Sequence, residues 1–319
     1  MLLNIALVIA GLAGLYVGGH WLVKGASRLA SSFGIPTLVI GLTVVAWATS
    51  APELVVNLQA ALAASTDIVL GNILGSNIAN IGLALSVMGI LFVVRVGWQL
   101  TIREIPIMLG ASVLLYVLVM DGMLSQTDGL LLFGGFIAFS GLVYYLAQRE
   151  RRQIDRDLER YEREEGLISP RISRWFEFGR LAAGALTLIV AADFTIDGAT
   201  ALADAVGVSE FVIGLTLVAV GTSLPEIAAS LVAGRHGETD IAVGNIVGSN
   251  ISNILAVLGL TTIVHPIAVP VQEVRPDFLV MLAFSASLLL LAVGHRWRRW
   301  VAVILLVAYV AYIGLTFAS

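Results

Sequence analysis

A long internal repeat is the feature that most constrains this chain of 319 residues. Residues 41–53 read GLTVVAWATSAPE and residues 214–226 read GLTLVAVGTSLPE, while residues 66–80 read TDIVLGNILGSNIAN and residues 239–253 read TDIAVGNIVGSNISN. A single offset, the one that carries Gly41 onto Gly214, aligns both pairs of segments without a gap, and 41–81 matches 214–254 at 23 of 41 positions. The sequence therefore predicts two structurally related halves.

The composition indicates that both halves lie in a membrane. Hydrophobic residues make up 58% of the chain and charged residues only 13%, about half the usual share of a soluble domain. Because a helix needs about 20 apolar residues to cross a bilayer, the pattern predicts an all-α polytopic protein with ten crossings. The expected crossings are 2–23, 36–64, 68–94, 104–120, 128–147, 176–203, 211–233, 241–263, 277–294 and 298–317.

A charged segment divides the ten predicted crossings into two sets of five. Residues 148–175 mix arginines with acids, a pattern typical of a solvated linker. We therefore expect a first five-helix half over 1–147 with its repeat at about 41–81, and a second over 176–319 with its repeat at about 214–254. Because an odd number of crossings separates equivalent points, the halves are expected to be inverted, a plan common in transporters.

The distribution of basic residues predicts the orientation. Placing the 148–175 linker in the cytoplasm puts 17 of the 18 lysines and arginines on the inner side and leaves only Arg275 outside. This is the bias that the positive-inside rule describes. We expect a multi-pass protein of a prokaryotic plasma membrane with both termini outside. The confinement of basic residues to short loops argues against nucleic-acid binding.

Each repeat contains a proline and a glutamate in the middle of a predicted crossing. Pro52 and Pro225 each remove a backbone donor, so we expect broken helices whose freed carbonyls line a polar cavity. Glu53 and Glu226 follow directly, and ionisable groups inside a membrane usually mark an ion or proton pathway. Two converging carboxylates would repel each other, and a divalent cation would neutralise both. A glutamate kept only for packing is the alternative reading of each.

The second segment of each repeat supplies neutral oxygens. Ser76 and Asn80 are four residues apart and share a helix face, as do Ser249 and Asn253. Together with freed carbonyls they would form a hard-oxygen site of the kind that Ca²⁺ and Na⁺ prefer. Hydrogen bonding between helices is the alternative role for these four residues. Four more asparagines could also serve as ion ligands or form hydrogen bonds between helices, and for these we favour the hydrogen bonds: Asn72, Asn77, Asn245 and Asn250.

These four blocks in register resemble the α-repeats of the cation/calcium antiporter superfamily, and most closely its prokaryotic sodium/calcium exchangers. The resemblance covers the whole chain as a five-plus-five architecture. It implies a Ca²⁺ site formed by Glu53, Glu226, Thr49 and Thr222. It also implies flanking Na⁺ sites formed by Ser50, Ser76, Ser223, Ser249 and the carbonyls of Ala46 and Ala219. Asn253 departs from the family where some relatives carry aspartate, so the number of Na⁺ ions is left open.

The expected function is secondary active exchange of Na⁺ for Ca²⁺ by alternating access, with electrogenic Ca²⁺ extrusion. Ca²⁺/H⁺ antiport on the same glutamates is the principal alternative; a channel and an intramembrane enzyme are weaker ones, because broken inverted repeats do not suit a continuous pore and no nucleophile–base pair accompanies the glutamates. The expected partners are Ca²⁺, Na⁺ and the lipid bilayer, with no cofactor and no obligate protein partner.

Overall fold

The computed structural model describes residues 1–63, 65–94, 100–165, 173–205, 219–289 and 299–318. These residues are helical apart from short turns and one two-residue ladder, in which β1 (Met123–Leu124) pairs antiparallel with β2 (Ile267–Ala268). The first half contains α1 (Leu2–Phe33), α2 (Thr37–Ile40), η1 (Gly41–Val45), α3 (Ala46–Thr49), α4 (Ala51–Leu62), α5 (Thr66–Ala79), η2 (Asn80–Leu85), α6 (Ser86–Leu91), η3 (Leu100–Glu104), α7 (Ile105–Leu118), η4 (Val119–Asp121) and α8 (Gln126–Glu165). The second half contains α9 (Arg174–Ala205), α11 (Ala219–Thr222), α12 (Leu224–Arg235), α13 (Thr239–Ser252), η6 (Asn253–Leu258), α14 (Gly259–Val264), α15 (Val271–Ser287) and α16 (Arg299–Ala318).

The repeat in the sequence is a repeat in structure. The run α5–η2–α6 has segments of 14, 6 and 6 residues, and α13–η6–α14 has the same lengths at the equivalent positions of the second half. The 12-residue helices α4 and α12 also begin and end at equivalent positions of the repeat. Similar sequences have therefore formed the same local structure twice, down to the position of a π-helical segment.

Seven helices of the described chain are long and apolar enough to cross a membrane, and the bent pair Thr37–Thr49 and Ala51–Leu62 raises the number to eight. The predicted crossings at 211–233 and 277–294 lie partly outside the described residues. The first crossing was predicted to end at residue 23, but α1 continues to Phe33. An all-α polytopic membrane protein is thus confirmed, and the count of ten crossings stays a prediction.

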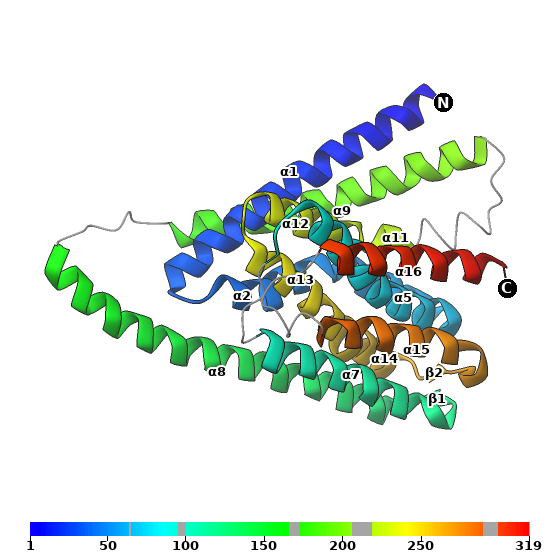
Figure 1. Cartoon of the computed structure of the whole chain (residues 1–319). Helices are drawn as coiled ribbons and strands as arrows, with labels where there is room; N and C mark the ends of the chain where they lie inside the picture. Colours follow the sequence, from blue (N-terminus) through cyan, green and yellow to red (C-terminus); the bar gives the residue numbers. More distant parts are fainter. Residues whose placement is uncertain (64, 95–99, 166–172, 206–218, 290–298, 319) are drawn as a thin grey trace.

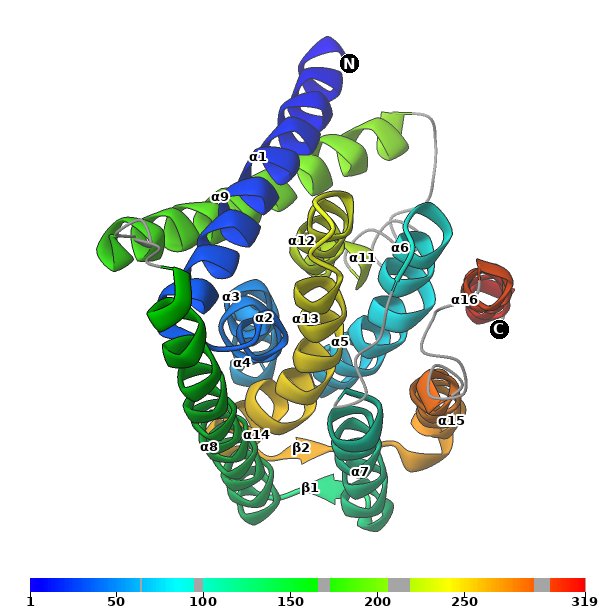
Figure 2. The same ribbon diagram turned by 60° about the vertical axis from the view of Figure 1, so that its left-hand side comes forward.

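The most polar helices lie at the centre of the bundle. Figure 2 shows α13 surrounded by α2–α4, α5 and α12, with α8, α7, α15 and α16 around them. In the apolar 18-residue stretch of Thr239–Val264, 100% of the residues are buried inside the protein. In that of Arg299–Thr316, only 17% are buried. Helices that carry Asn, Ser and Gly are therefore enclosed by protein, and uniformly apolar helices are left to face lipid, as the cost of polar groups in hydrocarbon requires.

Helices α1 and α9 lie side by side along one face of the bundle (Figures 1 and 2). Their backbones approach closely at glycines: a Cβ added to Gly184 would lie 2.8 Å from the carbonyl oxygen of Gly18. The buried Glu177 ties the pair together, because it accepts from Arg28 of α1 at 3.0 Å and from Arg180 of α9 at 2.6 Å. The two helices therefore form one closely packed unit.

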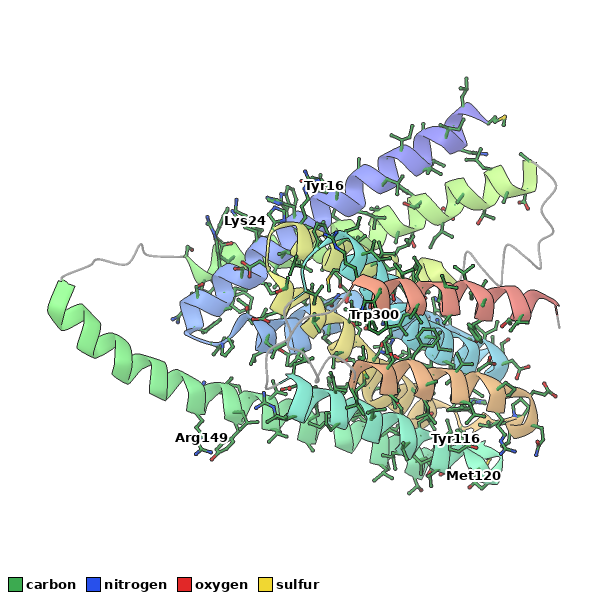
Figure 3. All side chains as sticks on the ribbon, in the orientation of Figure 1. Tyr16, Lys24, Tyr116, Met120, Arg149 and Trp300 are labelled. Carbon is green, nitrogen blue, oxygen red and sulfur yellow. The ribbon has the colours of Figure 1, made fainter. Side chains whose placement is uncertain are left out.

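The two chain ends lie toward one end of the molecule, and the end of α8 that leads to α9 lies at the other (Figure 1). In Figure 3, Lys24 and Arg149 lie toward the α8–α9 end and Met120 lies away from it. Helix α8 continues to Glu165 without a break, so no helix end marks the predicted boundary at residue 148.

Candidate cation site

The site is built on a helix break in each half. Ser50 separates α3 from α4 with φ −81° and ψ 7°, and Ser223 separates α11 from α12 with φ −86° and ψ 0°. A proline follows within the first turn of each new helix, where its missing N–H costs nothing. Glu53 and Glu226 therefore stand in the first turns of α4 and α12, where the positive end of the helix dipole favours a carboxylate.

The other side of the site is formed by two straight helices, each of which passes from α-helical to π-helical hydrogen bonding at an asparagine. Asn80 opens the π-helical segment η2, and Asn253 opens η6. Single turns of π-helix occur often at functional sites, because the extra residue re-aims side chains and frees carbonyls. Ser76 and Ser249 lie one turn earlier on the same faces.

All ten candidate side chains are enclosed. Glu53 and Glu226 are each 0% exposed, and the largest exposed fraction in the set, that of Thr222, is 8%. The set is Thr49, Ser50, Glu53, Ser76, Asn80, Thr222, Ser223, Glu226, Ser249 and Asn253. Charged and polar groups buried this deeply are costly unless something compensates them.

Hydrogen bonds join candidate residues across the two halves. Ser50 donates from Oγ to Oε1 of Glu226 at 3.1 Å, and Asn253 donates from Nδ2 to Oγ of Ser76 at 3.2 Å. Glu53 lies close enough to Glu226 for the two carboxylates to repel each other. The structure therefore brings the four repeat segments to one place.

Several buried oxygens at this place have no hydrogen-bond partner within the described residues. They include both carboxylate oxygens of Glu53, Oε2 of Glu226, the amide oxygens of Asn80 and Asn253, and the hydroxyls of Thr222, Ser223 and Ser249. The nitrogens of Asn80 and Asn253 are both used as donors, to Asn250 at 2.9 Å and to Ser76. Each amide therefore keeps its oxygen available as a ligand.

The two backbone candidates begin equivalent helical turns. The carbonyl of Ala46, the first residue of α3, accepts from the Ser50 N–H at 3.0 Å and lies 3.2 Å from the Thr49 hydroxyl. Ala219 is the first residue of α11, at the position equivalent to Ala46. Both therefore lie one turn before a break.

Asn245 is more central than its sequence pattern indicated. Its Nδ2 lies 3.1 Å from Oγ of Ser230 and 3.3 Å from the carbonyl of Glu226, and its Oδ1 accepts from Thr49 at 3.1 Å. Asn250, by contrast, donates to the carbonyl of Asn77 and so bridges the two straight helices. These contacts give both asparagines a role in positioning the site.

Sequence reasoning missed Asn57 and Ser230. They occupy equivalent positions in the two repeats, yet they differ in identity, so a search for repeated residues passes over them. Asn57 donates to the carbonyl of Glu53 at 2.7 Å, and Ser230 contacts Asn245. The available signal was a polar residue one turn after each glutamate on an otherwise apolar helix.

The donor set fits hard cations. Within the described residues no group of three or more His, Cys, Asp and Glu side chains is placed to hold a metal ion, and the side-chain donors gathered at this site are oxygens. Two carboxylates with amide, hydroxyl and carbonyl oxygens are the ligands that Ca²⁺ and Na⁺ take. Fold and site together define an integral multi-pass membrane protein with a carboxylate-bearing polar centre, an arrangement typical of transporters.

Comparison with known proteins identifies the family. The model of the sodium/calcium exchanger protein family matches residues 3–145 and 176–318, two ranges related by the offset of the repeat, and the chain belongs to this family. It is 40% identical to the inner membrane protein YrbG of Escherichia coli K12 over 94% of this chain and 90% of that protein. It is 31% identical to the sodium/calcium exchanger MaX1 of Methanosarcina acetivorans over 98% of each.

A solved structure matches almost the whole chain. The sodium-calcium exchanger NCX_Mj superposes with a TM-score of 0.84 at 30% identity, covering 99% of each chain. The resemblance to prokaryotic sodium/calcium exchangers is thus confirmed. The protein is a cation/calcium antiporter of the membrane and not an enzyme.

Proposed function

We propose that the chain exchanges Na⁺ for Ca²⁺ by alternating access, with both ions bound between Glu53 and Glu226. One observation carries the proposal: three of the four oxygens of these fully buried carboxylates have no hydrogen-bond partner in the described part of the chain. Unpaired buried charges are strongly unfavourable, and a divalent cation would neutralise both. The names of MaX1 and NCX_Mj, both sodium/calcium exchangers, support the same pair of ions.

The ligands divide between two kinds of ion in this proposal. Ca²⁺ would take the two glutamates with the hydroxyls of Thr49 and Thr222. Na⁺ would use the following oxygens in flanking sites: the hydroxyls of Ser50, Ser76, Ser223 and Ser249, the carbonyls of Ala46 and Ala219, and the amide oxygens of Asn80 and Asn253. The overlap around the glutamates makes the two ions compete, so inward Na⁺ would drive Ca²⁺ out.

The same proposal includes ten crossings in two inverted halves, 1–147 and 176–319, joined by the cytoplasmic linker 148–175. Elements that recur at equivalent positions of the repeat support two related halves. The chain ends at one end of the molecule and the α8–α9 junction at the other are what termini outside and a linker inside require (Figure 1). The exposed basic residues Lys24, Arg28 and Arg149 would then meet the cytoplasm.

We also propose that exchange is electrogenic. The two glutamates balance the charge of one Ca²⁺, whereas three Na⁺ ions on the same groups would leave one positive charge. Each net charge moved is worth about 2.3 kcal/mol per 100 mV of membrane potential. An imposed potential should therefore change the rate of Ca²⁺ uptake.

Uptake of ⁴⁵Ca²⁺ into proteoliposomes tests the proposal. Vesicles loaded with Na⁺ are compared with vesicles holding choline and an imposed proton gradient, and a potassium potential set with valinomycin tests electrogenicity. Uptake that requires internal Na⁺ supports Na⁺/Ca²⁺ exchange. Uptake that requires only the proton gradient would replace it with Ca²⁺/H⁺ antiport, in which the same glutamates carry protons.

A further inference from the structure

A pair of histidines joins α1 to the end of α12, away from the candidate cation site. Nδ1 of His20 lies 3.1 Å from Nε2 of His236, and the ring centroids are 4.9 Å apart. The pair opens into a cavity of about 290 Å³ that Lys24, Arg28 and Glu238 also line. His236 is exposed on the surface of the protein and His20 is half-buried.

The hydrogen-bond network fixes how the pair presents its nitrogens. Nδ1 of His236 lies 2.8 Å from the carbonyl of Val232, so this nitrogen carries the proton and donates it. Nε2 of His236 is then left with a free lone pair, and His20 donates to it from Nδ1. A histidine whose second nitrogen is held by a backbone carbonyl has the orientation and tautomer typical of metal-binding histidines.

We propose that His20 and His236 bind a first-row transition metal ion such as Zn²⁺, which ties α1 to α12. Zinc–nitrogen bonds of about 2.0–2.1 Å at a tetrahedral angle place two nitrogens about 3.3–3.4 Å apart. The 3.1 Å separation of the two ring nitrogens is close to this spacing. On binding, the proton of His20 moves from Nδ1 to Nε2, so both imidazoles stay neutral. Because the described side chains offer no third ligand of the His, Cys, Asp or Glu type in metal-binding position, water completes the coordination.

The surrounding charges set a modest affinity. Lys24 and Arg28 line the cavity, and Arg180 of α9 and Arg235 of α12 stand nearby, the latter over the ring of Tyr16 at 5.4 Å. These cations oppose a metal ion. Glu238, which accepts from Ser27 of α1 at 2.7 Å, offsets part of their charge. We expect a dissociation constant in the micromolar range rather than the nanomolar range of closed zinc sites.

The bridge would slow ion exchange. Helix α12 begins with the turn that carries Glu226, and α1 packs against α12, with Gly19 close to Ala228 and Val232. Glu226 is 0% exposed, so an ion can reach it from either side only if covering helices move. A metal ion that joins α1 to the far end of α12 resists such movement. Figure 3 shows Tyr16 and Lys24, which flank this stretch of α1, on the outside of the bundle.

Zinc binding to the purified full chain tests the site directly. Titration with ZnCl₂, followed by calorimetry in buffer without Na⁺ or Ca²⁺, should show one micromolar site. His20→Ala, His20→Gln and His236→Ala should each weaken binding by at least about tenfold, since loss of even an outer-shell partner costs that much. His265→Ala is the matched control, because His265 is a half-buried histidine whose Nδ1 contacts the Pro266 carbonyl elsewhere in the chain.

Glu226→Gln distinguishes zinc binding at the histidine pair from zinc binding at the central carboxylates, because it should leave the histidine site intact. In proteoliposomes, micromolar Zn²⁺ should slow ⁴⁵Ca²⁺ exchange by the wild type at least fivefold and by His236→Ala less than twofold. Folding of each variant is checked by its melting temperature. Zinc affinity that is unchanged in His20→Gln and His236→Ala, or lost in Glu226→Gln, would overturn the proposal whatever the transported ions prove to be.

Discussion

The two helix breaks share a backbone geometry but differ in their hydrogen bonds. At the first break, Thr49 lies within hydrogen-bond distance of Asn245, and Ser50 donates to Glu226. At the second, the hydroxyls of Thr222 and Ser223 have no partner among the described residues. Two halves of closely similar sequence therefore enclose one asymmetric site. Residues of one half hydrogen-bond to residues of the other, and in this packing the bonds form at the first break and not at the described hydroxyls of the second.

The asymmetry extends to the asparagines that support the breaks. Asn245 contacts Ser230, Thr49 and the Glu226 backbone, whereas the amide oxygen of its equivalent, Asn72, has no partner in the described structure. A local difference accompanies this, since Ser230 contacts Asn245 while its equivalent Asn57 turns back to the carbonyl of Glu53. The Asn245 side chain is thus held by two contacts within the second half and by Thr49 of the first half.

The largest loss of Ca²⁺ uptake is expected from the two equivalent glutamates, for which the halves should respond equally. Glu53→Gln and Glu226→Gln should each lower Na⁺-driven ⁴⁵Ca²⁺ uptake at least about a hundredfold, because a single remaining carboxylate leaves the divalent ion's charge uncompensated, a cost of several kcal/mol. Glu273→Gln, an exposed glutamate at the start of α15, is the control and should transport normally. Full activity in both variants would show that Glu53 and Glu226 are not part of the cation site.

The next effect should separate the halves. Asn245→Ala removes the three hydrogen-bond contacts of the Asn245 side chain, including those with Thr49 and Ser230, so we expect uptake to fall about tenfold, from the loss of roughly 1–3 kcal/mol of buried hydrogen bonding. Asn72→Ala is the matched variant and should change uptake less than threefold. Equal losses in initial rate would show that the observed asymmetry does not govern transport.

A smaller difference is expected between the two serines at the breaks. Ser50→Ala removes the donor to Oε1 of Glu226, while Ser223→Ala removes a hydroxyl without a described partner. One hydrogen bond to a buried carboxylate is worth about 1.5–3 kcal/mol before rearrangement. Measured as the half-saturating Ca²⁺ concentration, Ser50→Ala should raise the value at least about threefold more than Ser223→Ala, and the reverse order would contradict the assigned contacts.

The smallest difference between halves is expected in α1 and α9. Gly11 and Gly184 are equivalent positions, and an added Cβ would meet a carbonyl oxygen of the opposite helix at 2.8 Å in both, that of Ala191 for Gly11 and that of Gly18 for Gly184. Gly11→Ala and Gly184→Ala should therefore lower the melting temperature by similar amounts, a few degrees each for a cost of about 1–3 kcal/mol. Gly179→Ala, where the added atom meets nothing within 4 Å, is the control.

The sequence by itself determined the membrane class, the two related halves and the positions of the breaks. These follow from local physics, since apolar length sets a crossing, proline ends a helical run, and a repeated sequence forms a repeated structure. Glu53 and Glu226 were identifiable because a charge in the middle of an apolar run has few explanations other than function.

Only the tertiary structure decided which oxygens meet and which stay free. Asn245 and its equivalent Asn72 occupy the same place in the pattern. The packing of α13 against α3 and α12 gives partners to the Asn245 side chain, whereas the Asn72 amide oxygen meets none among the described residues. Likewise His20 and His236 are separated by 216 residues and meet only because α1 lies against the end of α12. Pattern and propensity act over a few turns of one helix, whereas contacts between helices depend on how the whole bundle closes.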